Sequence, residues 1–359
     1  MRSVNVKRYF WLGTLLVSAS APAQVQLSDE NAYNPIPSPD GLKIVAVRTG
    51  WSREGGSGGL GRSNLQSDLI ILDRTGRTTS ALLHADSFVA DWSRSGIVSF
   101  RDWSYALLSE EGRVLNEGHV CPAELARDPG SGCVERVAYL PASGSFVWVH
   151  QKFGDSVLIT PGGELSPHDH DKFLGEWLAP STDGRYIAVG PGRLGRSLSV
   201  YDMREKTWAH LGTAAIHPAD EWNWMEPSWN PWFADSSQIA FFTAEGLVLS
   251  SPDGKRKRVV LRTQERAGLA VPSPDGHAIA YATFASRPRT SGGGNMSIWN
   301  CTGIWVAGLD GSTAPRRLVG QTQSLTYDLR WLDNGHLVFD RIEAGLPPKA
   351  RIWTVAADH

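Results

Sequence analysis

The sequence predicts an all-β protein: a single seven-bladed β-propeller of four-stranded antiparallel blades, preceded by a signal peptide. Three observations point to this fold: a turn motif that recurs seven times, an alternating strand pattern after each turn, and a second strand and turn further along. The motif is clearest in PSPDGHAIAYATF, which begins at Pro272. Pro274, Asp275 and Gly276 favour a tight turn, because Pro presets φ, Asp bonds nearby backbone and Gly accepts positive φ.

The spacing of the motif matches propeller blades. The glycine position of the turn is occupied, in chain order, by Gly41, Gly96, Gly144, Gly184, Ser236, Gly276 and Gly335. Successive positions lie 40 to 59 residues apart, and periods of roughly 40–50 residues with strand content are typical of blades. Second strands such as DLIILDRTG from Asp68 and further short β runs bring each repeat to about four strands. Six or eight blades and an irregular β-sandwich are the alternatives.

The first 23 residues are expected to be a signal peptide, which leaves residues 24–359 for the propeller. Arg2, Lys7 and Arg8 form a basic region, YFWLGTLLVSA is a short apolar run, and Ala21 to Ala23 offer a small-residue cleavage site. The apolar run is shorter than the roughly 20 residues that span a bilayer, so no stable membrane insertion is expected. An uncleaved anchor is the alternative. The predicted location is the periplasm, with the extracellular space as the second choice.

The last repeat is incomplete, which predicts how the ring closes. Only about three strands follow Asp328, whereas QVQLS, from Gln24 to Ser28, is β-prone and belongs to no repeat. We expect this segment to supply the missing outer strand of the last blade, because that pairing removes an open sheet edge.

Charge argues against a nucleic-acid partner. The formal net charge is −2, and nucleic-acid binding would need a clustered basic face. The one dense basic run is GKRKRVV, from Gly254 to Val260. We expect it at a solvated hairpin tip, with contact to acidic polymers as the alternative.

Three cysteines in an exported chain predict one disulfide and one remaining thiol. Cys121 and Cys133 bracket a loop of modest size and are the expected pair. Cys301 would then be a buried thiol. The other two pairings stay open.

The P-S-P-D-G turn followed by xxIAY resembles the TolB-like, WD-type propeller repeats. These repeats occur in periplasmic propellers of the Tol–Pal envelope system and in the propeller domains of prolyl-oligopeptidase-type enzymes. The resemblance implies the fold and says little about function, because propellers host many activities. Two departures matter: no α/β domain precedes the first repeat, and GWSREGG from Gly50 lacks the G-x-S-x-G spacing of a serine hydrolase.

The two faces of the disc are predicted to differ. The connections of an antiparallel blade alternate between its ends, so the short turn motifs lie on one face. The long segments lie on the other, and loops gathered on one rim are where propellers place function. These segments are 49–67, 121–133, 166–177, 217–232 and 285–303.

One long segment carries the leading candidate for a binding site. It combines aromatic and acidic side chains: Trp222, Trp224, Trp229 and Trp232 with Asp220, Glu221 and Glu226. Tryptophan in a polar loop suits stacking on sugars or anchoring a protein partner. The alternative is that these rings fill the central channel or pack under the loop.

A second long segment carries a candidate metal site. It reads His168, Asp169, His170 and Asp171, and imidazole and carboxylate groups are ligands for a divalent metal. His210 or His217 would be the third ligand, but no spacing fixes it. One divalent ion is thus the single cofactor that the sequence suggests, and no cofactor is the leading expectation.

The function that these patterns predict is non-enzymatic. We expect an exported monomer that binds an envelope protein or a glycan through its long-loop face, with no catalytic residue. The alternative is a metal-dependent polysaccharide lyase or glycoside-processing enzyme on the propeller scaffold.

Overall fold

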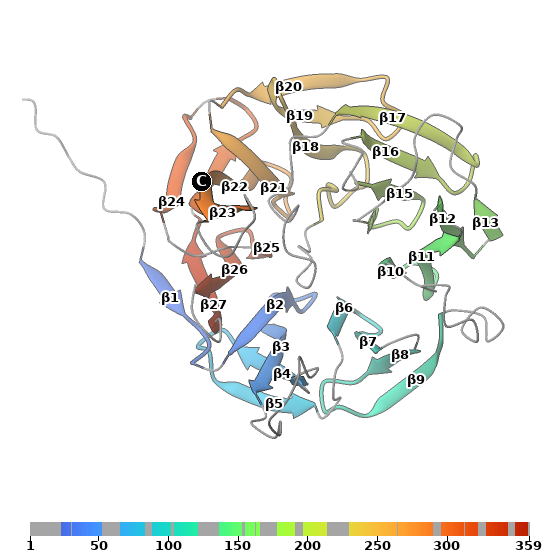
Figure 1. The fold of residues 1–359 in the computed structure, drawn as a ribbon, viewed down its shortest axis with the longest axis vertical. Helices are drawn as coiled ribbons and strands as arrows, with labels where there is room; N and C mark the ends of the chain where they lie inside the picture. Colours follow the sequence, from blue (N-terminus) through green and yellow to red (C-terminus); the bar gives the residue numbers. More distant parts are fainter. Residues whose placement is uncertain are drawn as a thin grey trace, which may run out of the picture.

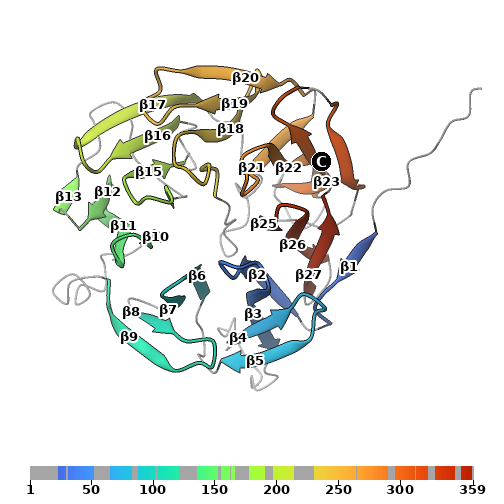
Figure 2. The same cartoon turned by 180° about the vertical axis from the view of Figure 1, so that it is seen from behind.

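The computed structural model describes residues 23–29, 31–51, 65–82, 88–101, 104–120, 136–152, 155–161, 163–165, 178–190, 197–213, 230–263, 265–289, 296–311, 313–321, 328–343 and 349–357. Within these residues the chain forms 27 β-strands in seven antiparallel sheets, which we number 1 to 7 in chain order. The sheets follow one another around a ring, each running from an inner strand to an outer one (Figures 1 and 2). The chain is therefore a β-propeller.

The strands have the following bounds. Sheet 1 contains β2 (Ala32–Pro37), β3 (Lys43–Trp51), β4 (Leu65–Asp73) and β5 (Thr78–Leu82). Sheet 2 contains β6 (Phe88–Ser93), β7 (Gly96–Arg101), β8 (Ser104–Leu108) and β9 (Val114–His119). Sheet 3 contains β10 (Arg136–Leu140), β11 (Ser145–Lys152), β12 (Asp155–Thr160) and β13 (Gly163–Leu165). Sheet 4 contains β14 (Leu178–Pro180), β15 (Tyr186–Val189), β16 (Ser197–Asp202) and β17 (Thr207–Thr213). Sheet 5 contains β18 (Ile239–Thr243), β19 (Gly246–Ser250) and β20 (Lys257–Leu261). Sheet 6 contains β21 (Arg266–Pro272), β22 (Ala278–Arg289), β23 (Met296–Gly308) and β24 (Arg316–Val319). Sheet 7 contains β25 (Leu329–Asp333), β26 (His336–Glu343), β27 (Lys349–Ala356) and β1 (Gln24–Gln26).

The predicted count of seven four-stranded blades needs a correction. In the described part of the chain six sheets have four strands, and sheet 5 has three. Its innermost segment contributes an isolated bridge between Trp232 and Ile239 and the bond from Ala240 N to Pro231 O. Pro231 has no N–H to donate, so one hydrogen bond of a regular ladder is missing at this position.

The predicted closure of the ring is confirmed. β1, from the start of the described chain, pairs antiparallel with β27 and completes sheet 7. The next residue, Leu27, donates its N–H to Ile352 O at 2.8 Å and is buried. The first and last strands of the described chain, β1 and β27, thus lie side by side in one sheet, as Figure 1 shows.

The core lies between neighbouring sheets. Because side chains alternate along a strand, successive residues face the sheet before and the sheet after their own. In β3, Ile44 and Ala46 pack toward sheet 7, against Val338 among others. Val45 and Val47 pack toward sheet 2, where Trp92 lies. Because both faces are covered, the strand reads as an apolar run instead of alternating with polar residues.

Two inner tryptophans fix adjacent sheets to each other. Trp232 Nε1 donates to Ala179 O of sheet 4 at 2.8 Å, and Trp331 Nε1 donates to Val271 O of sheet 6 at 2.9 Å. Both rings are buried. The interpretation of Trp232 as a member of a ligand-binding aromatic group is therefore wrong, since its ring and its N–H are used inside the core.

The turn motifs join the first and second strands of the four-stranded sheets, as predicted. One segment that was expected to be a loop instead forms a pair of strands. Residues 285–303 were expected to form a loop, but β22 and β23 continue into it and pair as far as Arg289 and Met296. This correction changes a loop into an extended β-hairpin. Strand β22 starts at the turn face, so the hairpin extends toward the opposite face.

One of the three cysteines, Cys301, lies within the described residues. Cys301 is buried, as expected, and its Sγ donates to Gly303 O at 3.5 Å. Cys121, Cys133 and residues 1–22 of the proposed signal peptide lie outside the described residues. Among the residues that the structure describes, no helix has the length and hydropathy needed to cross a membrane.

Candidate functional site

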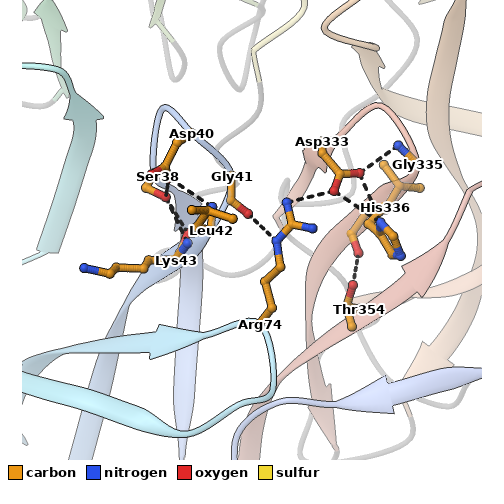
Figure 3. Close-up of polar contacts among 11 residues, drawn as sticks. Ser38, Asp40, Gly41, Leu42, Lys43, Arg74, Asp333, Gly335, His336 and Thr354 are labelled. Carbon is orange, nitrogen blue, oxygen red and sulfur yellow. Dashed lines mark hydrogen bonds and ion pairs between the residues drawn. The ribbon is translucent and has the colours of Figure 1, made fainter.

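The turn face is built from a repeated hydrogen-bond frame. In the first turn, Ser38 Oγ donates to Asp40 Oδ1 at 2.6 Å and accepts from Lys43 N at 2.9 Å (Figure 3). The same Ser–Asp pair recurs at Ser181, Ser251 and Ser273. The Ser38 hydroxyl lowers the pKa of Asp40, since it stabilises the ionised carboxylate.

Arg74 joins this frame to the neighbouring sheet. Its Nε donates to Gly41 O at 2.7 Å, and its guanidinium lies 2.8 Å from the carboxylate of Asp333 in sheet 7 (Figure 3). Gly41 has a φ of +67°, and a Cβ there would lie 2.1 Å from Leu332 O. The turns of sheets 1 and 7 are thus in direct backbone contact, which explains the glycine.

Similar contacts link other turns. Asp183 N of sheet 4 donates to Ser236 Oγ of sheet 5 at 3.1 Å, and Asp275 N of sheet 6 donates to Asn334 Oδ1 of sheet 7 at 3.1 Å. Lys43 forms an ion pair with Glu110 of sheet 2. The polar groups of this face therefore hold sheets together, which is a structural role.

A second polar group lies on inner strands. Asp91 of β6 and Arg330 of β25 interact electrostatically, and Asp328 also acts on Arg330. The side chains of Asp91 and Arg330 are partly exposed to solvent, but most of the volume around their charged groups is protein. Burial raises the pKa of Asp91 to about 6 and lowers the pKa of Arg330. Asp328 in turn is held by its N–H bond to Asp340 Oδ1 at 3.1 Å.

Sequence reasoning missed this group, although a signal for it exists. Asp91 and Arg330 each directly precede a buried inner-strand tryptophan, Trp92 or Trp331. A charged residue next to a buried tryptophan in an inner strand is the signal, because inner strands are otherwise mostly apolar. What brings the two residues together, however, is the closure of the ring.

The face opposite the turns carries the extended hairpin of β22 and β23. Its base is tied by polar contacts: Trp305 Nε1 donates to Thr283 Oγ1 at 3.1 Å, and Thr302 Oγ1 lies 2.8 Å from Thr283 Oγ1. Thr302 Oγ1 is also 3.1 Å from Glu265 Oε2. Phe284 and Cys301 are buried at the same level. The hairpin therefore begins at a packed base.

The predicted site residues lie outside the described part of the chain. This holds for the tryptophan and acidic group of Trp222, Trp224, Trp229, Glu221 and Glu226. It holds equally for the metal candidates His168, Asp169, His170 and Asp171. Both sets remain predictions. Within the described residues, no cluster of three or more His, Cys, Asp or Glu side chains could hold a metal ion.

Comparisons with known proteins support the fold. No protein-family model matches the sequence, and no curated protein matches it. Among solved structures, the chain is similar to the crystal structure of the Cps50 (Swd1) β-propeller domain of Myceliophteria_thermophila, with a TM-score of 0.55 and 11% sequence identity. The similarity covers 93% of this chain and 98% of that one. At this identity the match shows a β-propeller and leaves the TolB-like resemblance a prediction.

Proposed function

We propose that this protein is an exported, non-enzymatic β-propeller that binds a partner through the face opposite its turns. The proposed partner is an envelope protein or a glycan, the proposed location is the periplasm, and the protein is proposed to act as a monomer. The observation that carries the proposal is the difference between the two faces. The turn face is occupied by contacts between sheets, whereas a long hairpin and the longest connections belong to the other face.

A rigid scaffold that presents long connections on one face is the usual design of a binding protein. Beyond Phe284, β22 pairs with β23 and, among the described strands, with no other, so the extended hairpin has backbone edges without a strand partner. The connection that contains Trp222 and Trp224 runs from β17 to the inner segment of sheet 5, so by chain topology it starts at the same face as the hairpin. Aromatic side chains there would supply the anchors of an interface.

The test removes the hairpin without disturbing its base. Ala285 and Asn300 are paired directly, so replacing residues 286–299 by Asn-Gly keeps the register with a tight turn. This variant, a Trp222→Ala/Trp224→Ala variant and the wild type (residues 24–359) would each be cross-linked to envelope extract. Captured proteins and glycans would be identified by mass spectrometry.

The matched control lies on the turn face. Arg94→Ala/Arg113→Ala changes two exposed side chains next to the turns of sheet 2. We expect a partner that the wild type and this control retain, and that the hairpin variant or the tryptophan variant loses. Loss in the control with retention in both others would place binding on the turn face and contradict the proposal.

A further inference from the structure

Two neighbouring outer strands differ in charge from the others. Within the described residues, the outer strands of the sheets are β1, β5, β9, β13, β17, β20 and β24. Lys and Arg occur in two of them: β20, which reads KRVVL, and β24, which reads RRLV. These strands belong to sheets 5 and 6, which follow each other around the ring (Figure 1).

The cations of sheet 5 start at the hairpin tip, as expected, and extend into the strand. Lys255 and Arg256 end the turn after β19, and Lys257 and Arg258 begin β20, so half of the basic run is strand. All four side chains are exposed, as is Arg262 after the strand. Asp253 offsets part of this charge, since its carboxylate lies 3.7 Å from Lys255 Nζ. The run therefore carries a clear excess of positive charge.

The strand register places these cations on both sides of the edge. Arg258 is opposite Leu249, which packs toward sheet 6, so Arg258 lies on the sheet 6 side. Lys257 is opposite Ser250 and donates from Nζ to Leu211 O of sheet 4 at 2.8 Å. Alternation in a strand thus points successive charges to opposite sides of β20.

Sheet 6 adds a further cation on its side toward sheet 5, where the Arg317 guanidinium also donates to Thr302 O and Val319 O. Arg317 of β24 is opposite Trp305, and its guanidinium lies 5.6 Å from the centroid of that ring. Trp305 packs toward sheet 5, against the same apolar cluster as Leu249. The pairing therefore places Arg317 on the side of sheet 6 that faces sheet 5.

The backbone of β20 is a sheet edge. β20 ends the strand order of sheet 5, and in the described part of the chain no strand pairs with its outer side. Such an edge presents N–H and C=O groups to any extended chain. Val259, in its middle, is 37% exposed, so part of its side chain is open to solvent.

We propose that β20 is a docking edge to which an extended, acidic segment of a partner protein adds as an outer strand. This surface is separate from the long-connection face. Lysine and arginine on an edge deter neutral and basic strands, but opposite charges across a strand pair stabilise it. The same residues therefore repel most chains and select an acidic one, and the backbone supplies the pairing.

The test uses a fluorescein-labelled peptide of about ten residues that alternates Glu with Thr, a length that covers one strand. Binding to residues 24–359 would be measured by fluorescence anisotropy. We expect Arg256→Glu/Arg258→Glu to weaken binding about tenfold or more, because one attractive cross-strand position and the attractive residue just before the strand become repulsive. The control Arg94→Glu/Arg113→Glu makes the same charge change at exposed positions of sheet 2 and should leave binding unchanged.

Two further peptides separate strand addition from simple charge attraction. A peptide in which Lys replaces Glu should not bind. A peptide with an N-methyl group on every residue keeps its charge but has no backbone N–H to donate along either edge, so it should also fail. Equal binding of the N-methylated peptide, or of heparin at matched charge, would show a general polyanion surface and overturn the proposal. So would equal binding by the sheet 5 variant and the control. None of these outcomes depends on the hairpin, so this inference and the proposed function fail separately.

Discussion

Replacing Leu27 by alanine removes the side chain that the closing segment inserts between sheets 7 and 1. Leu27 is 3% exposed and packs in a cluster with Ile44, Leu332, Val338 and Ile352. Its backbone N–H would still reach Ile352 O, so the variant loses packing and keeps the hydrogen bond. Truncation of a buried leucine to alanine costs about 2–5 kcal/mol of unfolding free energy, the range reflecting how far the site collapses.

Val25 supplies the control, because it lies on the same segment and is 51% exposed. Val25→Ala should change stability by less than about 0.5 kcal/mol. Both variants would be unfolded in urea and followed by tryptophan fluorescence, and the midpoints compared at constant slope. If Leu27→Ala and Val25→Ala unfold together with the wild type, the N-terminal segment does not close the ring in solution. Our account of sheet 7 would then be refuted.

Three further predictions concern the turns, the inner strands and the tryptophans. Gly41→Ala should lower the unfolding free energy measured in urea by well over the roughly 1 kcal/mol of backbone strain, because its Cβ would meet Leu332 O. Gly311→Ala is the control: it has φ +71° and no close atoms, so it should lose that strain energy alone. Equal losses of stability in the two variants would contradict the contact between Gly41 and Leu332 O. Asp91 has a pKa of about 6 in the folded protein, above its unfolded value. The contribution of Asp91 to folding stability is therefore full below about pH 4 and is lost as the pH rises through 6. The stability of Asp91→Asn relative to wild type should therefore rise across that window, and parallel urea-midpoint curves from pH 4 to 7 would count against the raised pKa. Trp331→Phe leaves Val271 O without its donor and should cost about 1–3 kcal/mol; Trp148→Phe, whose Nε1 has no hydrogen-bond partner within the described residues, should cost less in the same assay.

Features that depend on a few consecutive residues could be predicted from the sequence. The Ser–Asp–Gly turns form as expected, since the hydroxyl, the carboxylate and the glycine lie within a few residues of each other. The closing strand could also be predicted, because a propeller blade with a missing strand leaves an open edge.

Features that depend on a neighbouring strand were missed. Residues 285–303 contain Arg, Pro and Gly and read as a loop, yet the pairing of β22 with β23 carries the ladder out to Arg289 and Met296. Local propensity is a weak guide there, because what stabilises a strand is its partner. Trp232 was misread for a similar reason: its polar sequence context says nothing of the carbonyl of Ala179, to which it donates.

The sequence by itself determined the repeat, the turn chemistry and the all-β class, because each of these arises from contacts within one repeat. The tertiary structure alone decided the rest: which charged side chains share the inner strands, which turns interlock, and which outer edges carry positive charge. Asp91 and Arg330 lie in different sheets and come together only when the ring forms. Arg258 and Arg317 also lie in different sheets, and only the ring turns them toward the same boundary between sheets 5 and 6. Interactions between repeats leave no local pattern in the sequence, and these interactions define the surfaces on which the proposed functions depend.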